Sequence, residues 1–167
     1  MTERTFAPWV EPIVARHRKD DAQVLEFARS LSEEAWAQSS GLDGWTCKDV
    51  MAHIGNGNDQ LYQQLLRQVI AGDKIDTSIF IDVDTDAENA AGVAERRSLS
   101  PAEVVAEFEE AAEEVLDLLA GLTDEHEHLR QDDPPFVLKG FMDLIGKESH
   151  SIEHLKQMQA ALEGFDG

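Results

Sequence analysis

Apolar residues recur at helical spacing in four long stretches of the chain. These run from about Ala7 to Leu31, from the residue after Thr46 to the break at Gly72, from Pro101 to Ala120, and from about Leu138 to Glu163. In each, apolar side chains return every three or four residues, so they share one face of an α-helix. No segment shows a convincing strand pattern. The sequence therefore predicts an all-α protein built as a four-helix bundle.

Capping residues mark where two of these helices begin, and two glycines interrupt the second helix. Thr46 is placed to cap the second helix, and Ser100 opens the third with Glu103 three residues later, which is a capping box. Gly55 and Gly57 lie inside the second helix, where each costs up to about 1 kcal/mol relative to alanine. This helix must therefore be held by packing or must kink.

A long acidic connection, residues 73–99, joins the second and third helices. Neighbouring antiparallel helices need only short loops, so this length permits a crossover connection. Within it, Asp86–Arg97 can form a short helix and Ile79–Val83 an extended segment. A loop this long in a compact domain is usually functional or partly structured. We expect it to supply one wall of a groove beside the bundle.

Length and composition fit one domain spanning residues 1–167. Hydrophobic residues make up 42% of the chain, enough for a core without disulfides. There are 34 acidic and 14 basic residues, a net charge of −20. A surface this negative repels phosphate backbones and anionic lipid, so we expect neither nucleic acid nor membrane as a partner.

Cysteine content and the N-terminus indicate the compartment. Cys47 is the single cysteine, so the chain has no intrachain disulfide, which fits a reducing environment. The first residues lack a basic region followed by an apolar core, and no stretch reaches the roughly 18 apolar residues of a membrane helix. We therefore expect a cytoplasmic protein.

Three histidines are the main candidates for chemistry. His150 and His154 are four residues apart within the fourth helix, so their imidazoles lie on one face. His53 comes from the second helix. Two nitrogens from one helix and a third from another can hold one divalent ion and leave positions open for water or substrate, as catalytic metal sites do. Counting 100° per residue places all three at the edge of the buried face, beside a groove.

The alternative is that these histidines are half-exposed and inert, as most histidines at helix edges are. His17 lies on the apolar side of the first helix. It is either an ordinary histidine at the edge of the core, or a fourth nitrogen for the metal, or a proton carrier. His126 and His128 fall in a loop and are expected to be solvated.

Weaker candidates surround this set. Cys47, in the first turn of a helix, is either a nucleophile or a buried structural thiol. Glu153 follows His150 by three residues and could act as a base beside it. Asn89 could orient a ligand and Arg96 could hold its carboxylate, although a solvated surface is the default for both.

Three segments carry a resemblance to a known superfamily. GWTCKDVMAHIGNGNDQL resembles the second-helix signature of the DinB-like, YfiT-like proteins, in which Trp, a Lys-Asp pair and an apolar residue precede a ligand histidine. ESHSIEHLKQM resembles their fourth-helix H-x-x-x-H signature. DAENAAGVAERRSLSPAEV is similar to the stretch before the third helix in the mycothiol-dependent maleylpyruvate isomerase branch.

The resemblance implies a bundle that holds a divalent metal, commonly zinc or nickel, on three ligands. Carried over to this chain, the ligands are His53, His150 and His154. Characterised members use low-molecular-weight thiols such as mycothiol, bacillithiol or glutathione in isomerase or S-transferase reactions. The chain stops shortly after the fourth helix, without the additional C-terminal domain of the maleylpyruvate isomerases, which argues against that specific activity.

The leading hypothesis is therefore a metal-dependent thiol transferase or isomerase acting on a small-molecule substrate, with hydrolysis as a close variant. A second hypothesis is a non-catalytic, stress-related bundle that binds metal or ligand without turnover. A third is an interaction module whose histidines are incidental. Helix faces of such bundles often pair, so a homodimer is compatible with each.

Overall fold

The computed structural model describes residues 4–42, 44–55, 57–77, 84–145 and 149–165. This part of the chain is mostly helical, and none of its helices has the length and apolarity to cross a bilayer. In chain order, the elements are α1 (Glu11–Ser30), α2 (Glu33–Trp36), α3 (Cys47–Ile54), α4 (Gly57–Ala71), α5 (Thr85–Glu95), α6 (Pro101–Ala120), η2 (Asp124–His128), β1 (Arg130–Asp132), β2 (Pro135–Val137), α7 (Leu138–Ile145) and α8 (His150–Ala161).

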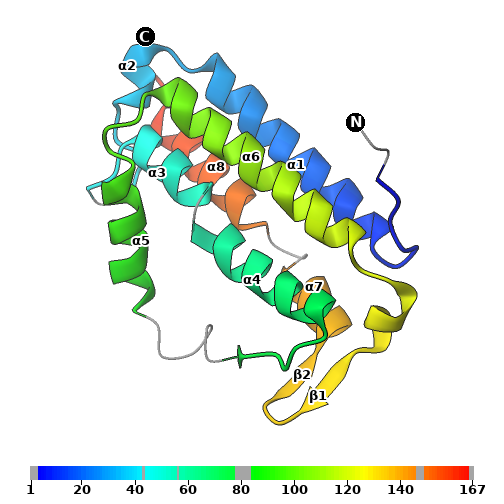
Figure 1. Ribbon diagram of the computed structural model, residues 1–167. Coiled ribbons are helices and arrows are strands. Elements are labelled where there is room, and N and C mark those ends of the chain that lie inside the picture. Colours follow the sequence, from blue (N-terminus) through cyan, green and yellow to red (C-terminus); the bar gives the residue numbers. More distant parts are fainter. Residues whose placement is uncertain (1–3, 43, 56, 78–83, 146–148, 166–167) are drawn as a thin grey trace.

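The predicted all-α bundle is confirmed. Its four arms are α1, the pair α3 and α4, α6, and the pair α7 and α8 (Figure 1). Helix α6 packs on α1, α3 and α4, while α8 packs on α1 and α3. The long connection between the second and third arms contains α5, which lies against α3 and α4. The elements that carry His53 and the other two histidines are therefore in direct contact.

The second arm breaks at Gly55 and is not one continuous helix. Gly55 ends α3, and α4 begins at Gly57. A Cβ added to Gly55 would lie 3.3 Å from the Cα of Phe108, so the backbones of α3 and α6 approach closely there. Phe108 is buried and cannot move aside. Of the two outcomes expected for this glycine-containing run, packing and kinking, the structure shows both.

The fourth arm departs from the prediction of one helix over Leu138–Glu163. Helix α7 ends at Ile145, and α8 begins at His150, after Ser149 in an extended conformation (φ −70°, ψ 116°). Serine competes with the backbone for hydrogen bonds and therefore favours helix starts over helix interiors. Beyond the other end of α8, Gly164 takes a positive φ of 85°, a conformation that glycine adopts readily after a helix.

A short hairpin precedes α7. Strands β1 and β2 pair antiparallel, with Gln131 opposite Phe136, across a cis Asp133–Pro134 bond. The amide of Gln131 accepts from the N–H of Ile75 at 2.9 Å and donates to its carbonyl at 3.0 Å. Three-residue strands are too short for an alternating pattern, so the sequence did not reveal them.

Within the crossover connection, the short helix is confirmed, with α5 shifted slightly from the predicted Asp86–Arg97. The extended segment expected at Ile79–Val83 lies outside the described residues. The end of α5 is fastened to its neighbours: Nζ of Lys48 donates to the carbonyls of Arg97 and Leu99 at 2.8 and 2.9 Å. The acidic connection is therefore anchored to α3, the helix that carries His53.

Buried apolar side chains form two clusters along the bundle. One includes Leu65 and Leu119 and joins α4, the end of α6 and α7. The other includes Val50, Phe108 and Met158 and joins α3, the start of α6 and α8. The second cluster positions the two helices that carry the three candidate histidines.

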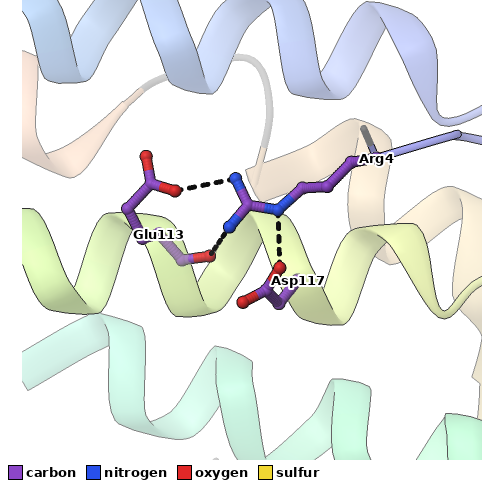
Figure 2. A network of polar contacts seen from close by, with 3 residues as sticks. All are labelled: Arg4, Glu113 and Asp117. Carbon is purple, nitrogen blue, oxygen red and sulfur yellow. Dashed lines mark hydrogen bonds and ion pairs between the residues drawn. The ribbon is translucent and has the colours of Figure 1, made fainter. Parts of the chain in front are cut away.

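The N-terminal segment is pinned along α6. Nε of Arg4 pairs with Asp117 at 2.5 Å and its Nη1 with Glu113 at 2.7 Å, and Figure 2 shows the guanidinium between the two carboxylates. Trp9 donates its indole N–H to the carbonyl of Thr123 at 3.0 Å. These contacts lie on the far end of α6 from the second apolar cluster and serve the scaffold.

Replacing Thr46 with alanine is expected to lower the free energy of unfolding by about 1 kcal/mol. Oγ1 of Thr46 accepts from the N–H of Asp49 at 3.2 Å, and the Asp49 carboxylate accepts from the N–H of Thr46 at 2.9 Å, so both halves of the capping box are present. Urea unfolding measures the loss. Thr46→Ser keeps the oxygen and should retain most of the stability; an equal loss in both variants would contradict the capping argument.

Candidate metal centre

Three imidazoles from two distant parts of the chain meet at one point. Nε2 of His150 lies 2.9 Å from Nε2 of His53 and 3.0 Å from Nε2 of His154. One nitrogen from each ring lies within 4.8 Å of the other two. Among the described residues, these three histidines form a group whose ring nitrogens are close enough together to bind one metal ion. The convergence expected from the sequence is therefore present.

The local sequence explains how each ring is placed. His53 is in the last turn of α3, whose start is fixed by the Thr46 capping box and whose side is tied to the connection by Lys48. His150 is the first residue of α8, and His154 stands one turn later on the same face. Packing of α3 on α8 brings the two faces together.

His53 is more buried than the helical wheel indicated. It is 4% exposed, whereas His150 and His154 are half-buried, as expected for the edge of a groove. Helix α3 contacts α2, α4, α5, α6 and α8, so nearly all of its circumference is covered. The ring of Trp45 also lies 5.2 Å from that of His53. The expected edge position is therefore wrong for His53 alone.

Burial keeps the imidazoles of His53 and His150 neutral at neutral pH. Desolvation, with smaller contributions from the positive charges of His150 and His154, lowers the pKa of His53 to about 4. The pKa of His150 also falls to about 4, mainly because of burial and then because of His154, while Glu153 acts in the opposite direction. The neutral imidazole is the form that binds a metal ion.

A glutamine sets the orientation of the third ring. Nδ1 of His154 lies 2.7 Å from Oε1 of Gln157. A proton on Nδ1 donates to this oxygen and leaves the lone pair of Nε2 directed at the other two rings. The i+3 spacing of Gln157 from His154 places it on the same side of the helix, but nothing else in the sequence marks it as a site residue.

The donor set fits a divalent ion. Nitrogens that bind zinc tetrahedrally at about 2.0–2.1 Å are roughly 3.3 Å apart, so the two Nε2 separations of 2.9 and 3.0 Å are slightly shorter than those of a loaded site. Without a cation, the two close Nε2 contacts are hydrogen bonds whose donors depend on the ring tautomers. In addition, Nδ1 of His53 is buried and has no hydrogen-bond partner among the described residues, which is unfavourable on its own. Three ring nitrogens this close together are donors that one divalent ion would bind.

The two residues expected to contact a ligand are both on or beside α5. Asn89 is half-buried on α5. The Arg96 guanidinium contacts Glu107 on α6 at 2.7 Å and the carbonyl of Gly92 at 3.1 Å, so at least part of its donor capacity ties α5 to α6. Their roles as ligand contacts stay predictions.

The remaining sequence candidates fall outside the histidine cluster. Cys47 is fully buried and burial raises its pKa, which disfavours the thiolate that a nucleophile needs. His17 does not join the cluster; its ring stacks on that of Tyr62 at 5.7 Å. Glu153 is exposed beside His150. His126 accepts from the N–H of Thr123 in η2, and His128 is exposed.

The fold and site together define a helical bundle with an all-histidine candidate metal centre. Residues 17–141 match the family model described as mycothiol maleylpyruvate isomerase N-terminal domain, and the chain belongs to this family. The matched range includes His53 and ends before His150 and His154. The resemblance noted in the sequence is thus confirmed.

Comparison with solved structures supports the same fold. The structure resembles the crystal structure of an uncharacterised protein from Escherichia coli UTI89, with a TM-score of 0.71, 12% sequence identity and 95% of each chain covered. At this identity, the likeness concerns the fold alone. A search of curated proteins found no match to this chain.

Proposed function

We propose that the protein is a metal-dependent enzyme that uses a low-molecular-weight thiol in an S-transferase or isomerase reaction. His53, His150 and His154 would hold the ion, with zinc or nickel as the candidates. One observation carries the proposal: the Nε2 atom of His150 lies 2.9 Å from that of His53 and 3.0 Å from that of His154. Burial keeps the rings of His53 and His150 neutral. Membership of a family described by a mycothiol-dependent isomerase supports the thiol.

A bound divalent ion would supply Lewis acidity, which holds a thiol as thiolate at neutral pH. The protein's own residues do the rest. Gln157 fixes the tautomer of His154 through its 2.7 Å contact. The buried ring of His53 and the Trp45 ring beside it keep water away from one side of the centre.

The reacting small molecule would approach from the half-buried side, where His150 and His154 lie. Helix α5 packs on α3, the helix that carries His53, which supports Asn89 and Arg96 as contacts for that molecule. In a transferase reaction, the thiol loses its proton to solvent, a carbon–sulfur bond forms, and the leaving group departs with the bonding electrons.

The test begins with metal content. Protein purified without chelators and without a histidine tag should contain about one zinc or nickel per chain by elemental analysis. It should then consume mycothiol, bacillithiol or glutathione in the presence of electrophilic substrates, and lose this activity on chelation. Thiol consumption that persists after chelation would refute the enzyme proposal. Stoichiometric metal with no consumption across the thiol panel would instead favour a non-catalytic binding bundle.

A further inference from the structure

One ring nitrogen of the candidate metal centre is left without an oxygen partner. His53 is 4% exposed, and its Nδ1 has no hydrogen-bond partner among the described residues. A polar atom buried in this way is unfavourable. The second nitrogen of a metal-binding histidine almost always donates to a carboxylate, a backbone carbonyl or water. The group that faces Nδ1 of His53 therefore takes the place of such an acceptor.

The contacts of the other two rings place a proton on this nitrogen. In the neutral rings, Nδ1 of His154 donates to Oε1 of Gln157, so Nε2 of His154 can only accept. Nε2 of His150, 3.0 Å away, must then carry a proton, and it also lies 2.9 Å from Nε2 of His53. His53 is left with a lone pair on Nε2 and its proton on Nδ1. Binding of a metal ion through Nε2 would require the same tautomer.

The indole of Trp45 lies against this buried imidazole. The two ring centroids are 5.2 Å apart and the ring planes are inclined by 59°. A tilted pair brings the positive edge of one ring toward the negative face of the other, and an N–H is attracted to an aromatic face. In the described part of the chain, Trp45 has no ring contact with His150 or His154. It therefore meets His53 on a different side from the other two imidazoles.

The local sequence explains why Trp45 lies over His53. Trp45 immediately precedes Thr46, the N-cap of α3. An apolar residue at this position commonly packs on the fourth residue of the helix, here Val50, and His53 follows on the same face three residues later. The carbonyl of Trp45 accepts from the N–H and the hydroxyl of Ser40 at 3.0 and 2.9 Å. The position of the indole therefore does not depend on a metal ion.

We propose that Trp45 is a positioning residue of the metal centre, whose indole face accepts the Nδ1 proton of His53 and so holds Nε2 toward His150. The inference rests on the proposed function for the ion, whereas the contact between the two rings exists without one. An aromatic face is a weaker acceptor than a carboxylate, so it orients the imidazole without raising its basicity as a carboxylate would.

Zinc affinity, measured by competition with a chelating dye, tests this role. Trp45→Leu should weaken zinc binding by about tenfold, the lower end of the range for partners of metal-binding histidines. Trp45→Phe keeps an aromatic face and should retain most of the affinity. The control Trp36→Leu removes a buried indole from the same apolar cluster and should bind zinc as wild type does. Equal affinities of the Leu and Phe variants at position 45, or an equal loss in Trp36→Leu, would overturn the inference.

NMR of chelator-treated protein separates the inference from the proposed function. In ¹⁵N-labelled wild type, we expect the proton of His53 on Nδ1, with its signal shifted upfield by the indole ring current. Trp45→Leu should remove this upfield shift and Trp36→Leu should keep it. If wild type binds no zinc but shows the shift, the proposed function fails and the role of Trp45 in orienting His53 stands. A proton on Nε2 of His53 in wild type would overturn the inference without the need for any variant.

Discussion

Replacing His150 with alanine is expected to weaken zinc binding by at least about a hundredfold, the largest effect we anticipate for a single substitution. His150 is the central donor, because its Nε2 lies 2.9 Å from that of His53 and 3.0 Å from that of His154. Its removal leaves two nitrogens, one on each helix, with no third to complete the set. Competition with a chelating dye measures the affinity.

The same substitution should have little effect on the metal-free fold. In the absence of a cation, the half-buried ring of His150 carries a desolvation cost that offsets part of its hydrogen bonds to His53 and His154. Zinc at about a thousand times its Kd stabilises the folded wild type by about 4 kcal/mol through mass action. The zinc-dependent rise in Tm should therefore disappear in His150→Ala, while Tm in chelator stays near that of wild type.

His128→Ala is the matched control, because this histidine is exposed and outside the cluster. It should keep both the affinity for zinc and the zinc-dependent rise in Tm. If His150→Ala binds zinc as tightly as the control does, the three imidazoles are not the ligands. A large fall of Tm in chelator would show instead that His150 is mainly a structural residue.

The histidine cluster was predictable because its signals are local and discrete. A four-residue spacing on one helix fixes the shared face of His150 and His154 whatever the rest of the chain does. The partnership with His53 is a hypothesis from the two predicted helices that the resemblance of its surrounding motif strengthens, since spacing alone cannot bring two distant helices together. Gln157 was missed because a glutamine on a polar helix face looks like any solvated residue until its partner is seen.

The predicted burial of His53 and the predicted continuous fourth helix are wrong because each treats two separate helices as one helix with a single periodicity. The wheel for the second arm joined His53 to residues beyond Gly55, although α3 ends there and has neighbours on almost every side. The apolar pattern of the fourth arm likewise predicts one continuous helix, whereas α8 begins as a separate helix at His150. Periodicity describes a face within one rigid helix, and tertiary contacts decide how many faces are buried.

A second strong effect is expected from pH, through a histidine outside the metal centre. Burial lowers the pKa of His17 to about 4; Arg16 lowers it further and Asp20 opposes the shift. The unfolded chain titrates near 6.5, so it takes up a proton before the folded protein does. The stability due to neutral His17 is fully present above pH 6.5 and is lost as the pH falls toward 4. At pH 5, the loss is roughly 2 kcal/mol.

His17→Phe isolates this contribution, because phenylalanine keeps a ring to stack on Tyr62 and cannot be protonated. Urea unfolding in chelator at pH 7.5 and pH 5.0 should show that wild type loses about 2 kcal/mol more than the variant over this interval. Exposed His128, changed to Gln, should leave the wild-type loss intact. The interval lies above the usual carboxylate pKa values, so the many acidic groups contribute little to the difference. Equal losses in wild type and His17→Phe would mean that His17 accepts its proton in the folded state, which the partly buried ring stacked on Tyr62 opposes.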